Sequence, residues 1–294
     1  MAGQTQMAKA QMAKAERLRA LHSGSTLTLP NAWDAGSAAL IALAGAEAIA
    51  TTSGGVAWSL GRPDGQRLTR DEMIAQVARI AAAVTVPVTA DIEGGYGPGP
   101  SDVAATVEAV IAAGAVGVNV EDSRAPGGPL FAPAEQAARI QAARTAAAAA
   151  GLPGLYINAR TDVFLFGIGA LQTRPEDVLA RSAAYAQAGA DSLFVPGLAD
   201  VQTITGLVKA SPLPINVMAG AGAPSVAELR SAGVRRVSVG TAITQAAYTL
   251  AMRAATELLA TGTYTELEAA LDFGTINNLF TNRAPASSRP ARKA

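Results

Sequence analysis

Acidic side chains follow two of the short apolar runs in this sequence, and their type and spacing suit a hard metal ion. Asp91 and Glu93 come at the end of one run, and Glu121 ends the next. Residues two apart on an extended segment point to the same face, so Asp91 and Glu93 should lie together, near Glu121 if the strands are neighbours. Three carboxylates without His or Cys predict a Mg²⁺ site, with Mn²⁺ as the alternative cofactor. The competing interpretation is that these acids cap helices or pair with arginines.

A positive side chain is expected beside these acids. Arg160 follows the apolar run 155–159 and carries a rigid guanidinium that suits a carboxylate or a phosphonate. Its alternative role is a structural ion pair with Asp162 or with an acid at a strand end.

A second anion-binding element is the tripeptide Ser53-Gly54-Gly55. It could offer a hydroxyl and backbone N–H groups, because its two glycines let the backbone approach a ligand closely. Alone, this tripeptide is usually only a turn. The following segment 54–68 is long for a connection between a strand and a helix, and we expect a lid there. Asp64 lies in this segment, where an acid is ordinarily solvated.

The composition excludes several classes of protein. The chain has 294 residues, 23 Lys+Arg, 23 Asp+Glu, one His and no Cys. Disulfide scaffolds, thiol nucleophiles and thiolate metal sites are therefore excluded, and a Ser-His-Asp triad is disfavoured. Zero net charge argues against nucleic acid as a partner, and no apolar run is long enough to span a membrane. We expect a cytoplasmic protein, with His22 at the surface.

The elements that would position these residues alternate along the chain. Eight short runs are typical of β-strands: Leu27–Leu29, Ala48–Thr52, Val86–Asp91, Gly117–Glu121, Leu155–Arg160, Ser192–Val195, Ile215–Met218 and Val237–Val239. Ala-rich stretches between them have helical spacing: Glu72–Val84, Ser101–Ala113, Pro133–Ala150, Pro175–Ala188 and Val201–Lys209. Strands alternating with helices indicate a parallel sheet, and eight repeats favour an α/β fold with a single (β/α)₈ TIM-type barrel. The carboxyl ends of its strands would then carry the active site.

The ends of the chain add elements to this barrel. We expect an N-terminal helical extension over residues 1–24, the barrel over 25–244 and a loose tail over 282–294. Residues 245–281 should form extra C-terminal helices, Gln245–Ala260 and Tyr264–Leu271, which cover a barrel end or pack on another subunit.

Taken together, the motifs resemble the isocitrate lyase/phosphoenolpyruvate mutase superfamily. TTSGG with GRPDG, ADIEGGYG, GVNVEDS and INARTD occur in that order, over roughly residues 27–240. The resemblance implies an (α/β)₈ barrel, a homo-oligomer (dimer or tetramer) with an exchanged C-terminal helix, and a Mg²⁺-bound 2-oxo or 2-hydroxy carboxylate.

The resemblance also assigns roles by position. It places Asp91, Glu93 and Glu121 at the metal, and Asp64 beside metal and substrate. In the family, the residues at Ser53, Gly54 and Gly55 hold the substrate carboxylate, and the residue at Arg160 clamps an anionic oxygen. Asn216 stands where lyase members place an Asn that contacts the substrate.

Departures from the family pattern narrow the chemistry. Isocitrate and methylisocitrate lyases carry a Lys-Lys-Cys-Gly-His loop whose Cys is the catalytic acid, whereas this chain has Ser123-Arg124-Ala125-Pro126 after Asp122. The Lys and Asn that phosphonate enzymes use in this loop are also missing, although Arg124 could substitute. Where the family usually has Asp-x-Asp, this chain has Asp91-Ile92-Glu93, so the second acid has a longer side chain.

The resulting hypothesis is a Mg²⁺-dependent carbon–carbon lyase or decarboxylase. It would act on a small 2-oxo or 2-hydroxy dicarboxylate, oxaloacetate-like first, through an enolate. Decarboxylation is favoured because the departing CO₂ needs no protein acid. The alternatives are a phosphoenolpyruvate mutase or phosphonopyruvate hydrolase that acts on a P–C bond, and a barrel that binds 2-oxo acids without catalysis.

Overall fold

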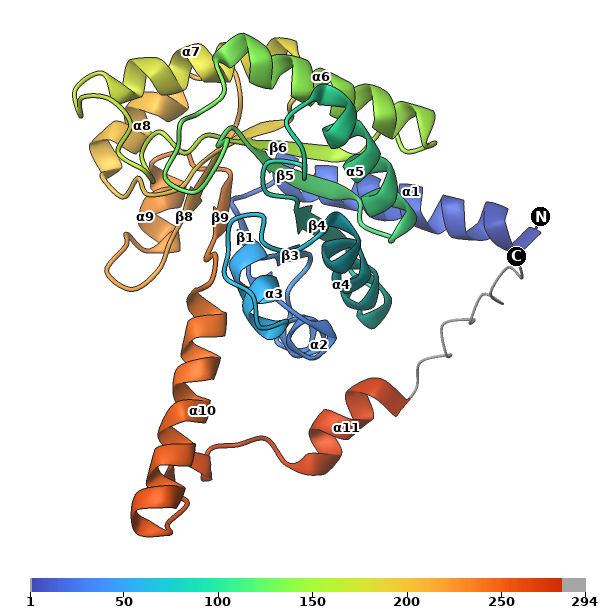
Figure 1. The fold of residues 1–294 in the computed structure, drawn as a ribbon, viewed down its shortest axis with the longest axis vertical. Coiled ribbons are helices and arrows are strands. Elements are labelled where there is room, and N and C mark those ends of the chain that lie inside the picture. The colour runs from blue at the N-terminus through green and yellow to red at the C-terminus, as the bar shows by residue number, and fades with distance from the viewer. Residues whose placement is uncertain (1, 282–294) are drawn as a thin grey trace. The chain divides into compact units, whose positions relative to one another are not determined.

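A computed structural model describes residues 2–281, with side chains from residue 6 onward (Figure 1). The predicted tail 282–294 lies outside the described residues. The chain divides into two compact units, Met1–Ala246 and Ala247–Ala294.

Parallel strands form a barrel in the first unit. They are β1 (Leu27–Leu29), β2 (Asn31–Ala32), β3 (Ile49–Thr51), β4 (Val88–Asp91), β5 (Gly117–Glu121), β6 (Tyr156–Arg160), β7 (Ser192–Val195), β8 (Ile215–Met218) and β9 (Arg236–Ser238). Their order is β1-β9-β8-β7-β6-β5-β4-β3-β2, and every pair is parallel. The predicted TIM-type barrel is confirmed.

Pro30 explains why nine strands replace the expected eight. It separates β1, which pairs with β9, from β2, which pairs with β3. Proline has no N–H to donate to a sheet ladder, so the first strand is interrupted there. Its carbonyl still accepts the N–H of Ala50 at 3.3 Å. The two halves of one strand thus close the barrel by pairing with its first and last neighbours.

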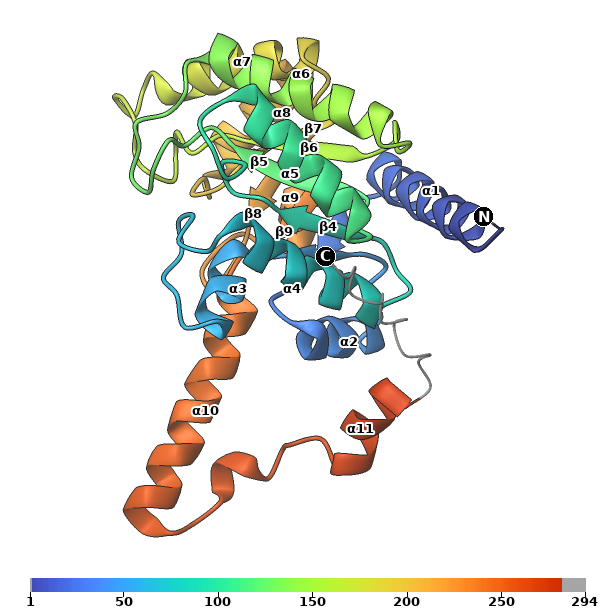
Figure 2. The ribbon, with the colours of Figure 1, turned by 45° about the vertical axis from the view of Figure 1, so that its right-hand side comes forward.

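Helices lie outside these strands in both views (Figures 1 and 2). The first unit contains α1 (Ala2–Ser23), α2 (Ala35–Leu43), α3 (Ser53–Ser59), α4 (Arg70–Ala83), α5 (Pro100–Ala112), α6 (Pro133–Ala149), α7 (Arg174–Gln187), α8 (Val201–Ala210) and α9 (Val226–Ser231). The five predicted helices correspond to α4 through α8. The sequence analysis did not identify α2, α3 or α9, although Asp34 and Ser37 form a capping box at the start of α2.

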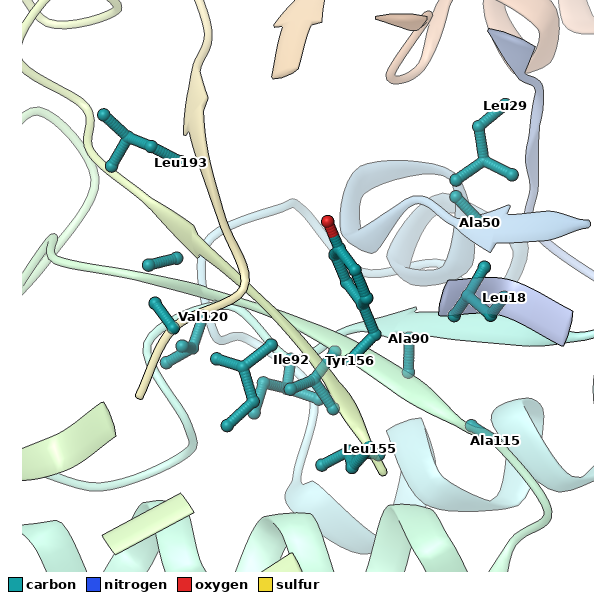
Figure 3. Close-up of a cluster of buried hydrophobic side chains, with 14 of the residues drawn as sticks. Leu18, Leu29, Ala50, Ala90, Ile92, Ala115, Val120, Leu155, Tyr156 and Leu193 are labelled. Carbon is teal, nitrogen blue, oxygen red and sulfur yellow. The ribbon is translucent and has the colours of Figure 1, made fainter. Parts of the chain in front are cut away.

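Helix α1 packs across the segments that lead into the strands. Gln11 donates to the carbonyls of Ile111 and Ala115, and Arg19 donates to that of Gly154. Leu18 is completely buried among the strand residues of the core (Figure 3). The N-terminal helix is therefore part of the barrel's packing.

The expectation that His22 lies at the surface was wrong. His22 is buried, its ring stacks on Tyr156 with centroids 3.8 Å apart, and Nδ1 lies 2.8 Å from the Leu18 carbonyl oxygen. Burial, assisted by the charge of Arg236, lowers the pKa of His22 to about 3. The packing of α1 against β6, which no local pattern reveals, places this ring inside.

The second unit contains most of α10 (Ala242–Thr261), a 3₁₀ turn (Thr265–Leu267) and α11 (Phe273–Thr281). Helix α10 matches the predicted Gln245–Ala260, but the predicted helix Tyr264–Leu271 was wrong. The Glu257 carboxylate accepts the N–H groups of Thr265 and Glu266, which favours a single turn there, and Asp272 accepts the N–H of Thr275 at the start of α11. Many large apolar side chains of this unit are exposed, Leu259 and Phe273 most of all.

Within the described part of the chain, no helix combines the length and the apolar character needed to cross a membrane.

Replacing Leu18 by Ala tests whether α1 is part of the core. Because Leu18 has no exposed surface, the substitution should lower the free energy of unfolding by about 2–5 kcal/mol. Met7 on the same helix is 75% exposed, so Met7→Ala should change it by less than about 0.5 kcal/mol. Urea denaturation of both variants makes the comparison; equal, small losses would show that α1 is dispensable.

Candidate active site at the carboxyl ends of the strands

A cavity of about 210 Å³ opens at the carboxyl ends of the barrel strands. Its polar lining comprises Asn31, Thr52, Ser53, Asp64, Asp91, Asn119, Arg160, Ser238 and Thr241, and the rest is Leu165, Phe194, Pro196, Met218 and Gly240. Active sites of barrel enzymes occupy this end. A larger cavity of about 580 Å³, lined by residues such as Leu21 and Ile41, has Glu47 as its one ionisable lining group and offers no comparable chemistry.

The tripeptide Ser53-Gly54-Gly55 forms the first turn of α3 rather than an isolated turn. The Ser53 N–H donates to Asp91 Oδ2 at 3.5 Å, and Ser53 lines the cavity. Gly54 and Gly55 are buried behind it. A Cβ on Gly54 would lie 2.8 Å from Thr241 Cγ2 and 3.1 Å from Asp64 Oδ2, so glycine lets both side chains approach this turn. The carboxylate-holding role of these residues stays a prediction.

Asp91 and Glu93 do not face the same way. Strand β4 ends at Asp91, and Glu93 adopts a left-handed backbone conformation with φ of 49°. The alternation rule for extended chains therefore stops before Glu93. Asp91 lines the cavity, whereas the Glu93 carboxylate accepts the Gln66 N–H and the Tyr96 hydroxyl, the latter at 2.9 Å. Gln66 thereby ties the loop 60–69 to this acid.

Glu121 and Arg160 form an ion pair across neighbouring strands. Arg160 Nη1 lies 2.8 Å from Glu121 Oε2, and Arg160 Nε lies 2.6 Å from Asp162 Oδ1. The structural ion pairs considered for Arg160 are thus present, and Arg160 also lines the cavity. Among the described residues, its ion pairs use Nε and Nη1. Nη2 is therefore the guanidinium nitrogen that these ion pairs leave unused.

Burial raises the pKa of all three predicted metal-site acids. For Asp91, the charge of Arg160 opposes this shift and that of Asp64 adds to it. Burial and the neighbouring Asp91 raise the pKa of Glu93 to about 7. Burial raises the pKa of Glu121 well above its ordinary value, although Arg160 acts in the opposite direction. Carboxylates crowded in a medium of low dielectric are ionised together only if a cation joins them.

The carboxylates at this site are the type of ligand that Mg²⁺ prefers, but they do not surround a metal position completely. Within the described ranges, no three His, Cys, Asp or Glu side chains gather closely enough to hold a metal ion. Mg²⁺ keeps several waters and commonly takes only one or two direct carboxylates. Asp91, which faces the cavity, suits a direct ligand, and Glu93 and Glu121 suit contacts through water.

Two other candidate residues lie outside the cavity lining. Asn216 is completely buried, and its side-chain amide bonds to groups of the barrel interior and, at 3.3 Å, to the hydroxyl of Ser238, which lines the cavity. Arg124 pairs with Glu135 at 2.6 Å on the surface. The substrate contact expected for Asn216 stays a prediction that this placement does not favour.

Asn119, in the middle of β5, lines the cavity but was not among the predicted site residues. A signal for it existed, because Asn119 lies two residues before Glu121 on a strand and must share its face. A polar residue at an inward position of an otherwise apolar run points to the barrel interior.

Known proteins are similar to this chain over most of its length. The family model described as phosphoenolpyruvate phosphomutase matches residues 18–259. A crystal structure of a Burkholderia cenocepacia protein, provisionally named a lyase/mutase, is 41% identical with a TM-score of 0.86, over 95% of this chain and 100% of its own. The 2-methylisocitrate lyase of Escherichia coli is 32% identical over 228 residues, 73% of this chain and 74% of its own. Oxaloacetate decarboxylase 2 of Pseudomonas fluorescens is 34% identical over 209 residues, 68% of this chain and 67% of its own.

The raised pKa of Glu93 predicts how stability depends on pH without metal. Between its ordinary pKa of 4.5 and about 7, the folded state holds a proton that the unfolded state has lost. The free energy of unfolding should therefore fall as pH rises through this window, by about 3 kcal/mol at most from this group. Urea denaturation in EDTA from about pH 5 to 8 measures the slope. Glu93→Gln removes one of the titrating groups and should make the slope smaller, with Asp91 and Glu121 supplying the rest; an equal slope in both proteins would contradict the assignment.

Proposed function

The chain belongs to the phosphoenolpyruvate phosphomutase family and is a lyase-type enzyme, and on that premise we propose that it is a Mg²⁺-dependent carbon–carbon lyase or decarboxylase. The resemblance predicted from the motifs is thereby confirmed at the level of the family. The proposed substrate is a small 2-oxo or 2-hydroxy dicarboxylate, with oxaloacetate-like acids first.

One observation carries the proposal: acids and a guanidinium line the same small cavity. Asp91, Asp64 and Ser53 line it together with Arg160, and the apolar side chains of Leu165 and Phe194 complete the wall. Carboxylates can bind a cation, and an arginine beside them can bind an anion. Such a site suits a substrate that has a chelating 2-oxo acid end and a second carboxylate.

The residues of the chain would position the substrate and stabilise developing charge. When bound, the divalent cation supplies Lewis-acid polarisation of the 2-oxo group. Arg160 would hold a carboxylate through Nη2, and the Ser53 end of α3 would donate hydrogen bonds to another oxygen. Asp64 would lie beside cation and substrate, as the family motif implies. The apolar side chains of Leu165 and Phe194 would exclude water from the part of the cavity that they line.

The supply of protons favours decarboxylation. The sequence has no Cys, and the ring of its one His stacks on Tyr156 at the start of β6, away from the cavity. Loss of CO₂ leaves an enolate that water can protonate, whereas aldol-type cleavage gains more from a dedicated acid. The relatives named above include one oxaloacetate decarboxylase, which agrees with this choice.

The rival chemistry at a P–C bond is less well supported. A phosphonate would call for additional positive charge at the cavity, and Arg124 instead bonds Glu135 and lies over the Phe131 ring. Because the matching family model is described as phosphoenolpyruvate phosphomutase, the substrate panel below also includes a phosphonate. Binding of 2-oxo acids without turnover is the third outcome.

We also propose a homo-oligomer, dimer or tetramer. The exposed apolar side chains of α10 and the following residues, among them Leu259 and Phe273, are the surface that assembly would cover. The cytoplasmic location stays a prediction.

A substrate panel tests the reaction. It contains oxaloacetate, methylated malates, 2-methylisocitrate and phosphonopyruvate, each with Mg²⁺ and with EDTA, while pyruvate, CO₂ and phosphate are followed. We expect pyruvate and CO₂ from oxaloacetate above the rate of metal alone, and loss of this activity in EDTA. Phosphate released from phosphonopyruvate alone would transfer the protein to P–C chemistry, and oxalate binding with no turnover would leave a binding protein.

Substitution of Arg160 tests the anion site. Arg160→Gln removes the charge and should weaken oxalate binding, measured by calorimetry with Mg²⁺, by about 10-fold or more. Arg124→Ala, a substitution outside the cavity lining, is the control and should leave the affinity within about twofold. Thermal melting of each variant checks the fold. Unchanged oxalate affinity in a folded Arg160→Gln protein would show that the anion binds elsewhere.

A further inference from the structure

A chain of side-chain amides runs through the barrel interior and ends at the cavity with Asn119. Asn119, Asn158 and Asn216 come from β5, β6 and β8, and each is almost entirely buried. Asn158 Nδ2 lies 2.8 Å from Asn119 Oδ1 and 3.0 Å from Asn216 Oδ1. The direction in which these amides point decides whether Asn119 offers the cavity a donor or an acceptor.

Arg236 fixes the amide of Asn119 at the cavity end of this chain. Arg236 is completely enclosed in the barrel, and its Nη2 lies 3.2 Å from Asn119 Oδ1. A guanidinium only donates hydrogen bonds, so the atom that faces it must be the oxygen. Since Oδ1 points inward to Arg236 and Asn158, Nδ2 is the atom turned toward the cavity.

Backbone carbonyls fix the opposite end independently. Asn216 Nδ2 donates to the carbonyl oxygens of Val217, at 2.8 Å, and Arg236, at 3.1 Å. Carbonyls only accept, so Asn216 must turn Oδ1 toward Asn158, and Asn158 must donate to it from Nδ2. The hydroxyl of Ser192 donates to Asn158 Oδ1 at 2.5 Å, which agrees with the same direction. Reversing any one amide would set two donors or two acceptors against each other.

The outward N–H₂ group of Asn119 has no protein acceptor within the described part of the chain. Every hydrogen bond of the Asn119 side chain to those residues is made by Oδ1. Asp91, its partner across the sheet, already accepts the N–H groups of Glu93 and Ser53 on its two carboxylate oxygens. The donor therefore stands beside the acid that suits the metal, in the lining of the cavity.

We propose that Asn119 is a substrate-binding residue whose Nδ2 donates a hydrogen bond to an oxygen of the bound 2-oxo acid. Arg236, Asn158 and Asn216 are positioning residues that hold this amide in one orientation. The inference rests on the proposed function, because it takes the occupant of the cavity to be an oxygen-rich acid. It also gives Asn216 a role one step removed from the substrate.

Asn119→Asp separates binding from folding. The carboxylate keeps the size of the amide and gains an ionic contact with Arg236, so the thermal midpoint should stay equal or rise. It presents an acceptor where the substrate needs a donor, so oxalate affinity with Mg²⁺ should fall by more than about 10-fold. Asn119→Ala, which removes the donor without adding charge, should lower it about 3- to 10-fold. Gln202→Glu, exposed on α8, adds the same charge elsewhere and should leave affinity within about twofold.

A double-mutant cycle tests the positioning role of Arg236. Arg236→Met removes the donor that orients Asn119 and should weaken oxalate binding several-fold, while Arg236→Lys keeps a donor and should restore most of it. In the Asn119→Ala background, Arg236→Met should have no further effect, because the amide it orients is gone. An equal loss in both backgrounds would show that Arg236 acts through the fold alone and would overturn its positioning role.

The outcomes also separate this inference from the proposed function. If the unaltered enzyme binds no oxalate, the proposed function fails and the role of Asn119 fails with it. If the unaltered enzyme binds oxalate and a folded Asn119→Asp protein binds it within about twofold, the role of Asn119 alone is overturned.

Discussion

The constraint on which this site depends is the burial of several carboxylates around a single guanidinium. Asp91 and Glu93 are buried and the Glu121 side chain is only 12% exposed, while Arg160 is shared between Glu121 and Asp162. One cation cannot neutralise this group, so burial raises the pKa of its acids. The protein therefore carries more acids here than Arg160 can neutralise, and the proposed cation would compensate the remaining negative charge. The strands of the barrel hold these acids in place.

Beneath the acids, the barrel interior is polar as well as apolar. Its asparagines and Arg236 are bonded in one direction, so the hydrogen-bonding character of the cavity floor is set by groups that never reach the cavity. Such a network specifies orientation because each member has a distinct donor and acceptor atom. Aliphatic side chains would fill the same space without choosing which atom faces the substrate.

The sequence predicted the features that depend on local pattern. Alternating strands and helices predicted the barrel, and the positions of Asp91 and Arg160 at strand ends placed them at the cavity. Features that depend on backbone conformation or tertiary packing were not predicted from the sequence. Glu93 leaves the extended conformation, the two glycines after Ser53 belong to a helix, and His22 is buried by the docking of α1. None of these follows from residue type and spacing alone.

The bond from the Gln66 N–H to Glu93 has a thermodynamic consequence for the loop 60–69. A cation bound at this carboxylate would compete with the N–H for the same negative charge, and loosening of the loop would leave the carboxylate with one partner fewer. The two events are linked, so each shifts the equilibrium of the other by the same free energy. Binding at Glu93 and the order of the loop 60–69 would therefore be reciprocal properties that meet in one hydrogen bond.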